Sequence, residues 1–202
     1  MEIALLVPHA PEQIPTPGAT LNAPGKALTF LAASPEILRF REDIGFDADP
    51  VPLHRHLAQT ERFTVLSGTL EITIADQIVR LGEGESLEVP PGVLHTYAPG
   101  SAEIGQAAAA TLIEVELWPA RHADHFFEVI YGLTRERRLP PRNLRDGIAL
   151  MALAHRHRFI FGRQPVWLMR GVSGVCALIA AVFRIDAWVP RFLPRAPSDR
   201  LP

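Results

Sequence analysis

Alternating apolar and polar residues recur in short runs through the first 118 residues of the chain. Within each run the apolar side chains stand two apart, which is the spacing of a strand with one buried face. Pro, Gly, Ser and Asp separate the runs, as is typical of turns. The predicted strands cover residues 26–32, 36–46, 61–66, 69–74, 77–81, 86–89, 93–98 and 111–117. Many short strands without helices between them indicate a β-sandwich or a closed barrel.

After residue 118 the apolar residues follow the three- and four-residue spacing of helices. Helices are predicted over 124–133, from Asn143 as N-cap to about Arg158, and from Val166 to about Arg184. Residues at the other end are rich in Pro and Gly and show little periodicity. We therefore expect an irregular N-terminal arm over 1–25, a β-barrel over 26–118 and a basic, apolar helical extension over 119–202.

Charge is divided unevenly between these segments. Residues 1–118 hold 6 Lys and Arg against 16 Asp and Glu, whereas residues 119–202 hold 14 Arg against 6 acidic residues. This asymmetry predicts a cationic helical segment that lies against an acidic barrel, its own or that of a second copy. The single cysteine and the absence of a basic, apolar leader in the first residues predict a cytoplasmic protein without a secretory signal.

The last predicted helix contains thirteen consecutive uncharged residues, from Gly171 to Phe183. A membrane-spanning helix needs about 20 apolar residues. We therefore favour packing on the protein or in a homodimer interface, with membrane-surface association through 166–184 as the alternative. Nucleic-acid binding is not expected, because the arginines are spread over apolar helices without a known DNA-reading motif.

Three histidines and one glutamate are spaced as a set of metal ligands. His54 and His56 lie two apart and therefore share one face of a strand. Glu61 opens the next strand, and a Pro-Pro-Gly turn carries His95 back across the first pair. Three imidazoles and one carboxylate on converging strands predict a metal site with mixed nitrogen and oxygen ligands.

The same segment resembles the two sequence motifs of the cupin superfamily. The first motif has His-x-His, four residues, Glu, six residues and Gly, and it matches His54, His56, Glu61 and Gly68. The second has Gly, five residues, Pro-x-Gly, two residues and His, and it matches Gly84, Pro90, Gly92 and His95. The resemblance implies a mainly β fold, a cupin barrel (double-stranded β-helix or jelly roll, RmlC-like), here followed by the C-terminal helical segment of compact bacterial cupin proteins.

The ligand set suits one divalent transition metal ion: Fe(II), Mn(II), Ni(II), Cu(II), Co(II) or Zn(II). The resemblance implies a metal-dependent enzyme, because cupins include dioxygenases, isomerases and decarboxylases. We expect a small oxygen-rich metabolite as substrate and a dioxygenase-like oxidoreductase as the first hypothesis. Glu61 and Tyr97 are the candidate catalytic residues, the first as a base and the second as a hydrogen-bond donor. The alternative is a non-catalytic metal- or small-molecule-binding module whose helical tail contacts a partner or a membrane.

Overall fold

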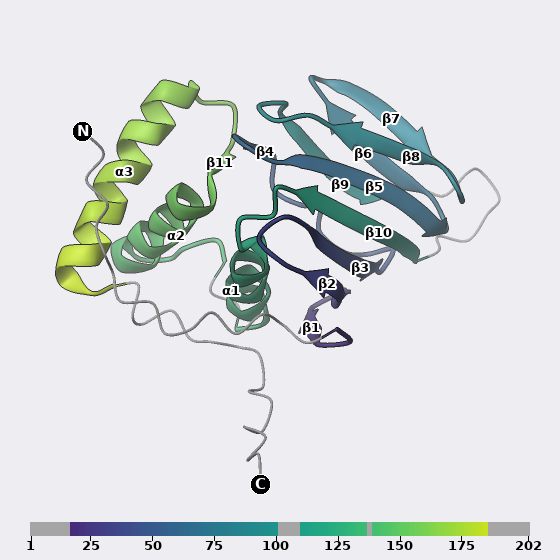
Figure 1. Ribbon diagram of the computed structural model, residues 1–202, viewed down its shortest axis with the longest axis horizontal. Helices are drawn as coiled ribbons and strands as arrows, with labels where there is room; N and C mark the ends of the chain where they lie inside the picture. The colour runs from purple at the N-terminus through teal and green to yellow at the C-terminus, as the bar shows by residue number, and fades with distance from the viewer. Residues whose placement is uncertain (1–16, 101–109, 137–138, 186–202) are drawn as a thin grey trace, which may run out of the picture.

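Two antiparallel β-sheets form the body of the protein, and three helices lie at one end of it (Figure 1). The structure, a computed structural model, describes residues 17–100, 110–136 and 139–185. The six-stranded sheet runs in the order β1 (Thr20–Ala23), β2 (Lys26–Ala33), β3 (Leu38–Ile44), β10 (Thr111–Trp118), β5 (Thr60–Ser67) and β8 (Ser86–Val89). The five-stranded sheet runs in the order β11 (Phe159–Phe161), β4 (His54–His56), β9 (His95–Pro99), β6 (Leu70–Ile74) and β7 (Gln77–Leu81).

Strict alternation along the strands places the core between the two sheets. In β10, Thr111, Ile113, Val115 and Leu117 are buried, while the residues between them are only partly covered. The outward-facing Glu116 instead meets Arg62 on the neighbouring strand β5. The two sheets thus bury one face each against the other, which confirms the predicted jelly-roll barrel.

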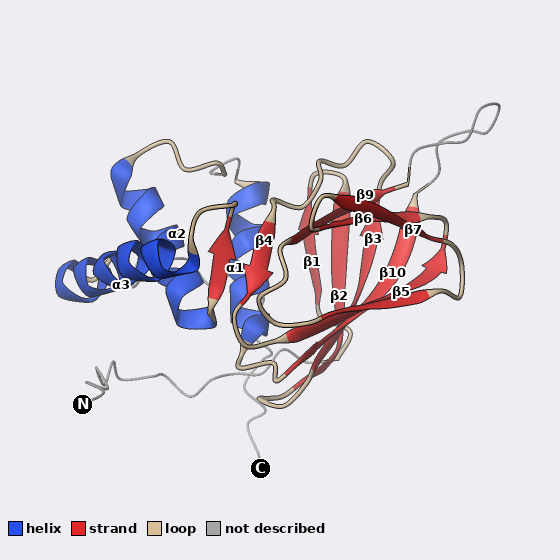
Figure 2. Cartoon of the chain, turned by 90° about the horizontal axis from the view of Figure 1, so that it is seen from above, coloured by secondary structure: helices blue, strands red, loops and turns tan. Residues whose placement is uncertain are grey.

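Three helices follow the barrel strands: α1 (Ala123–Arg135), α2 (Leu144–His157) and α3 (Val166–Phe183). Their positions agree with the predicted helices to within about two residues. Asn143 caps α2 as predicted, because its side-chain oxygen accepts a hydrogen bond of 2.9 Å from the backbone N–H of Asp146. Figure 2 shows α2 and α3 side by side at the end of the molecule away from β7.

Two strands lie outside the predicted barrel segment. Thr20–Ala23, expected to be irregular, forms β1 and pairs with β2 in an antiparallel register. The second is Phe159–Phe161, which forms β11 in the middle of the expected helical extension and pairs with β4. Both strands are short and take their stability from a partner strand, so local periodicity could not reveal them. Residues 1–16 of the predicted arm and 186–202 of the extension lie outside the described residues.

Helix α1 joins the barrel instead of lying apart from it. Its Phe127 ring meets Phe40 of β3 at a centroid distance of 4.8 Å. On the side toward β11, the Phe126 ring stacks on Phe159 at 4.0 Å with an interplanar angle of 15°. These contacts attach α1 both to the six-stranded sheet and, through β11, to the edge of the five-stranded sheet.

Candidate metal centre

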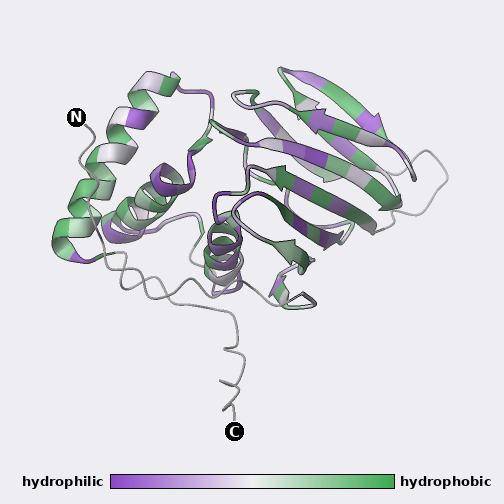
Figure 3. Cartoon of the chain, in the orientation of Figure 1, coloured by the Kyte–Doolittle hydropathy of each residue, from purple (hydrophilic) through white to green (hydrophobic). Residues whose placement is uncertain are grey.

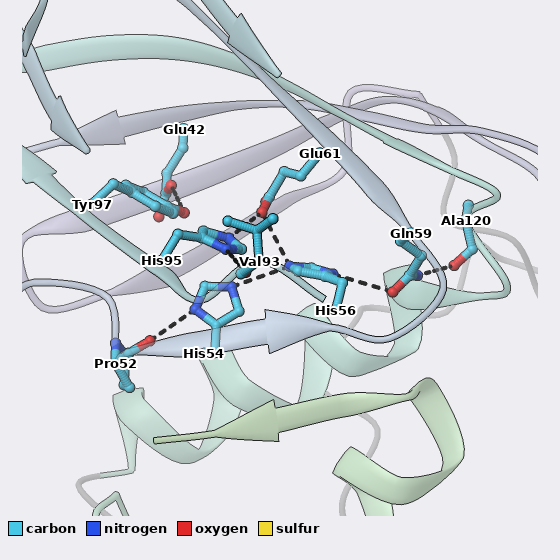
Figure 4. A network of polar contacts seen from close by, with 10 residues as sticks. All are labelled: Glu42, Pro52, His54, His56, Gln59, Glu61, Val93, His95, Tyr97 and Ala120. Atoms are coloured by element: carbon cyan, nitrogen blue, oxygen red, sulfur yellow. Dashed lines mark hydrogen bonds and ion pairs between the residues drawn. The ribbon is translucent and has the colours of Figure 1, made fainter. Parts of the chain in front are cut away.

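The four predicted ligands come from three strands in both sheets and converge inside the barrel (Figure 4). His54 and His56 lie on β4, and His95 lies directly opposite His54 on the neighbouring strand β9. Glu61 reaches the same point from β5 of the other sheet. All four side chains are buried, the most exposed being His54 at 5%. The structure therefore brings together the whole predicted set.

The ligand atoms lie close enough to contact a single ion. One nitrogen of each histidine and a carboxylate oxygen of Glu61 all lie within 4.8 Å of one another. The Nε2 atoms of His54 and His56 are 3.1 Å apart. Oε2 of Glu61 is 2.9 Å from Nε2 of His95 and 3.1 Å from Nε2 of His56. Four electron-rich atoms thus point at a common centre.

The outward-facing nitrogen of each histidine contacts an oxygen atom that accepts a hydrogen bond from it. Nδ1 of His54 donates to the Pro52 carbonyl at 2.8 Å, and Nδ1 of His95 donates to the Val93 carbonyl at 2.9 Å. Nδ1 of His56 donates to Oε1 of Gln59 at 3.2 Å. When Nδ1 carries the proton, Nε2 of a neutral ring presents a lone pair to the centre. Outer partners of this kind orient the imidazoles that bind metals.

The side chain of Gln59 was not predicted from the sequence. Its amide nitrogen donates to the Ala120 carbonyl at 2.8 Å, which fixes the amide so that its oxygen faces His56. Gln59 is almost completely buried although it lies between strands β4 and β5. No local pattern marks it, because its partner Ala120 is 61 residues away.

Glycines of the two motifs shape the turns around the centre. The backbone N–H of Gly92, which has a φ of 84°, donates to the His56 carbonyl at 2.7 Å and so connects the Pro-Pro-Gly turn with β4. Gly68 also has a φ of 84°, and a Cβ atom there would approach the Ala110 carbonyl oxygen to 2.8 Å. Only glycine meets both demands at Gly68 without strain.

Burial and mutual contact set the charges of the ligands. Burial, aided by the neighbouring His56 and His95, lowers the pKa of His54 to about 3, so that this ring is neutral. Burial alone would raise the pKa of Glu61, but the contacts with His56 and His95 hold it well below its usual range. For His95, burial alone would lower the pKa. The contact with Glu61 has the larger effect and raises the pKa of His95. A neutral imidazole and an ionised carboxylate are the forms that bind metal.

Tyr97, a predicted catalytic residue, is buried beside the centre, but its hydroxyl is already engaged. It donates to Oε2 of Glu42 at 2.7 Å, and the hydroxyl of Tyr131 donates to Oε1 of the same carboxylate at 2.6 Å. Burial raises the pKa of Glu42, while Lys26 and the two tyrosines oppose that rise. Burial and the charge of Glu42 raise the pKa of both tyrosines well above its usual range, so both remain protonated donors.

Glu42 and Tyr131 were missed by the sequence analysis. Glu42 shares the inward parity of Phe40 and Ile44 in β3, so an acidic residue at a core position was a usable signal. Tyr131 lies on α1, 89 residues away, and nothing in its neighbourhood indicates a partner in the barrel. The outcome is a second buried polar cluster next to the candidate metal centre.

Among the described residues, only the four predicted ligands form a group of at least three that could hold a metal ion. His155 is exposed and contacts Ser173 on α3 through Nδ1 at 3.1 Å. His157 is buried, and its Nε2 lies 3.3 Å from Nδ1 of His125 on α1. These histidines join helices to one another and add no ligand to the centre.

Part of the chain matches a known protein family. Residues 46–105 match the protein family described as "Cupin domain", a segment that includes all four ligands. No curated protein matches the chain.

Several solved structures are similar to about half of this chain at low identity. KdgF from Halomonas sp. is 17% identical over 50% of this chain and 84% of its own, with a TM-score of 0.43. An RmlC-like cupin from Shewanella frigidimarina is 20% identical over 55% and 87%, with a TM-score of 0.42. The Cnp3 cupin domain of Schizosaccharomyces pombe is 16% identical over 50% and 69%, with a TM-score of 0.43.

Proposed function

We propose that this chain is a cupin-type, metal-dependent enzyme that acts on a small, oxygen-rich metabolite. A dioxygenase-like oxidation is the first reaction to test. The observation that carries the proposal is the convergence of three Nε2 atoms and one carboxylate oxygen in a buried space. Electron-rich atoms 2.9 to 3.1 Å apart repel one another unless a cation lies among them. Either protons or a metal ion can fill that role, and a fixed set of three imidazoles and one carboxylate suits a metal.

The residues fit a divalent transition metal, whose identity the ligand types leave open among Fe(II), Mn(II), Ni(II), Cu(II), Co(II) and Zn(II). His54, His56, Glu61 and His95 would hold the ion, and the carbonyl partners of the outer nitrogens would keep the rings in place. When bound, such an ion supplies Lewis acidity or, if it is iron, chemistry with dioxygen.

A substrate with a carboxylate, enolate or keto group matches this site. A divalent ion with one carboxylate ligand keeps a formal charge of about +1, which attracts anionic oxygen atoms. Because all four ligands are buried, with the Phe63 ring 6.2 Å from the ring of His95 between centroids, a small metabolite suits the site better than a polymer. Within the chain itself, Glu61 is an ionised carboxylate beside the centre, but the contacts with His56 and His95 that lower its pKa also make it a weak base.

One observation favours the alternative, a non-catalytic binding module. The Tyr97 hydroxyl, expected to donate to substrate oxygen, donates instead to Glu42. Direct action of Tyr97 on a substrate would require the Glu42 contact to break, which leaves a buried carboxylate with one partner fewer. A site that only binds metal and a small ligand needs no such change.

Metal content of the purified protein tests the proposal. We expect wild type to hold about one metal ion per chain, and His95→Ala to lose it, with affinity reduced more than about tenfold. The matched control is His155→Ala, which removes an exposed imidazole on α2 and should retain the metal. Circular dichroism checks that both variants remain folded. Full metal content in folded His95→Ala protein would contradict the assignment.

Oxygen consumption and product formation with a panel of hydroxy and keto acids then separate the two functions. An enzyme turns over at least one acid in the wild type and none in His95→Ala. If the metal-loaded wild type binds acids in calorimetry but converts none of them, the binding module is the better description.

A further inference from the structure

Helix α3 turns an apolar face to solvent along its whole length. Trp167 and Phe183, near its two ends, are 76% and 71% exposed, and Val175 and Leu178 between them are 58% and 53% exposed. Figure 3 shows this helix coloured largely as hydrophobic, in contrast to the alternating colours of the strands. Only 11% of its residues are buried within the protein. The helix is therefore not the core helix that its composition would suggest.

Beyond its first turns, the exposed face of α3 carries no charge. Arg170 lies in the first turn and a half and Arg184 directly follows the helix, and both are exposed. From Gly171 to Phe183 there is no charged residue. With 18 residues, α3 is about 27 Å long, and by length and composition alone it could cross a membrane.

The segment that carries this face is rich in arginine, and Arg170 and Arg184 lie in or beside α3 itself. Residues 139–185, which contain α2, β11 and α3, hold seven arginines and one acidic residue, Asp146. Arginines around an apolar helix face are the arrangement that binds to anionic lipid surfaces, because the guanidinium groups reach the headgroups while apolar side chains enter the acyl boundary. Two copies of this chain meeting through the same face would instead bring like charges together.

We propose that α3 docks the protein flat on a bilayer that contains anionic lipids. The opposite face of the helix packs on α2, where Ser173 and Ala180 are buried and Nδ1 of His155 lies 3.1 Å from the Ser173 hydroxyl oxygen. Crossing the bilayer would separate α3 from α2 or draw the arginines of α2 into the hydrocarbon, and both are costly. Lying in the interface keeps the α2 contact and buries only the exposed face.

This orientation leaves the barrel in water. In Figure 1 α3 lies at the outer end of the helical part, with α2 between most of it and the barrel, and one end of α3 lies near the edge strand β11. Docking through α3 thus covers none of the strands that carry the candidate metal ligands. The surface is separate from the metal centre, and the inference does not depend on the chemistry proposed for that centre.

Flotation with vesicles tests the proposal on the full chain. We expect binding to vesicles of phosphatidylcholine and phosphatidylglycerol, weaker binding to phosphatidylcholine alone, and release of the bound protein as salt concentration rises. The double variant Val175→Glu with Leu178→Glu should bind at least about tenfold more weakly, since it places two charges in the apolar face. Trp167 fluorescence should shift to the blue on binding, because the ring moves out of water.

Matched controls keep the result interpretable. Ile78→Glu changes an equally exposed apolar residue, 68% exposed on β7, and should leave vesicle binding unchanged. Circular dichroism shows that each variant is folded. Failure of folded wild type to float with either vesicle overturns the proposal. A second result would also overturn the proposal: wild-type protein does not bind vesicles and is a dimer in light scattering, whereas the double variant is a monomer. A second copy would then cover the face.

Discussion

Helix α3 is richer in apolar residues than the barrel, and the two regions place these residues in opposite directions. In β10, every second side chain enters the space between the sheets and is almost inaccessible to solvent. In α3, the side chains of Val172, Val175 and Val182 lie on the outside, and few of its residues are buried. Burial of apolar area stabilises the barrel. The exposed apolar area of α3 is available for contact with another protein or a membrane.

This difference shows that the extension after residue 118 has two parts with different relations to the barrel. The first comprises α1 and β11, which contribute Tyr131 to the Glu42 cluster and Phe159 to the surroundings of the centre. The Phe159 ring lies 4.2 Å from the ring of His56, between centroids. The second part is α3, which packs on α2 and contributes no ligand. A barrel truncated at residue 118 would lack β11, the edge strand that pairs with β4.

The largest effect is expected at the contact between α1 and β11, which ties the first part of the extension to the barrel. Replacing Phe126 with Ala should lower the free energy of unfolding by about 3–5 kcal/mol, because it empties a buried space where two rings stack at 4.0 Å. Chemical denaturation with two probes, circular dichroism and bound metal, measures the loss. The control Phe126→Leu keeps most of the apolar volume and should cost less. A loss under 1 kcal/mol for Phe126→Ala would mean that α1 and the barrel are independent.

His157, at the end of α2, lies against Phe126 and His125 of α1. The pH dependence of stability therefore tests the packing of α1 in a second way. Burial, with help from the neighbouring His125 and Arg156, lowers the pKa of His157 to about 3. An unfolded histidine titrates near 6.5, so below that pH the unfolded chain binds a proton that the folded protein does not. The free energy of unfolding should therefore fall as pH decreases, and this residue should contribute about 2 kcal/mol between pH 7.5 and 5.

Denaturation of wild type and His157→Gln across this pH range gives the measurement. The variant should show the shallower decline. His155→Gln should change the decline less, because burial and the neighbouring Arg170 and Arg158 lower the pKa of this mostly exposed ring less far than that of His157. Titration of His54 affects all three proteins equally and cancels in the comparison. Parallel curves for wild type and His157→Gln would show that His157 is open to solvent and that the contact between the helices and β11 is loose.

Features with a local cause could be predicted from the sequence. The four ligands were found because strand parity and turn glycines fix where each side chain points, and each of these signals lies within a few residues. The N-cap of α2 was found in the same way, since Asn143 contacts an N–H three residues away. The two β motifs therefore contain nearly all the information for the centre itself.

The missed features depend on contacts between distant segments. The three residues of β11 become a strand only because β4 offers an open edge, and Glu42 tolerates burial because Tyr97 and Tyr131 donate to it. The solvent exposure of α3 could not be predicted from the spacing of apolar residues either. A hydrophobic helix has the same sequence pattern whether its outer face is covered or exposed. Sequence patterns show which residues are apolar enough to favour burial. They do not show which other segment or surface buries them.

The smallest expected effect falls on the exposed face of α3. Leu178→Gln should change the free energy of unfolding by less than about 0.5 kcal/mol, because the leucine side chain is 53% exposed and its polar replacement stays in water. Denaturation of dilute protein without lipid measures this, with the buried Leu153→Gln as a control that should be clearly destabilised. A loss at Leu178 comparable to that at Leu153 would place α3 against another surface in solution. The contrast between a barrel that buries its apolar residues and a helix that exposes them would then disappear.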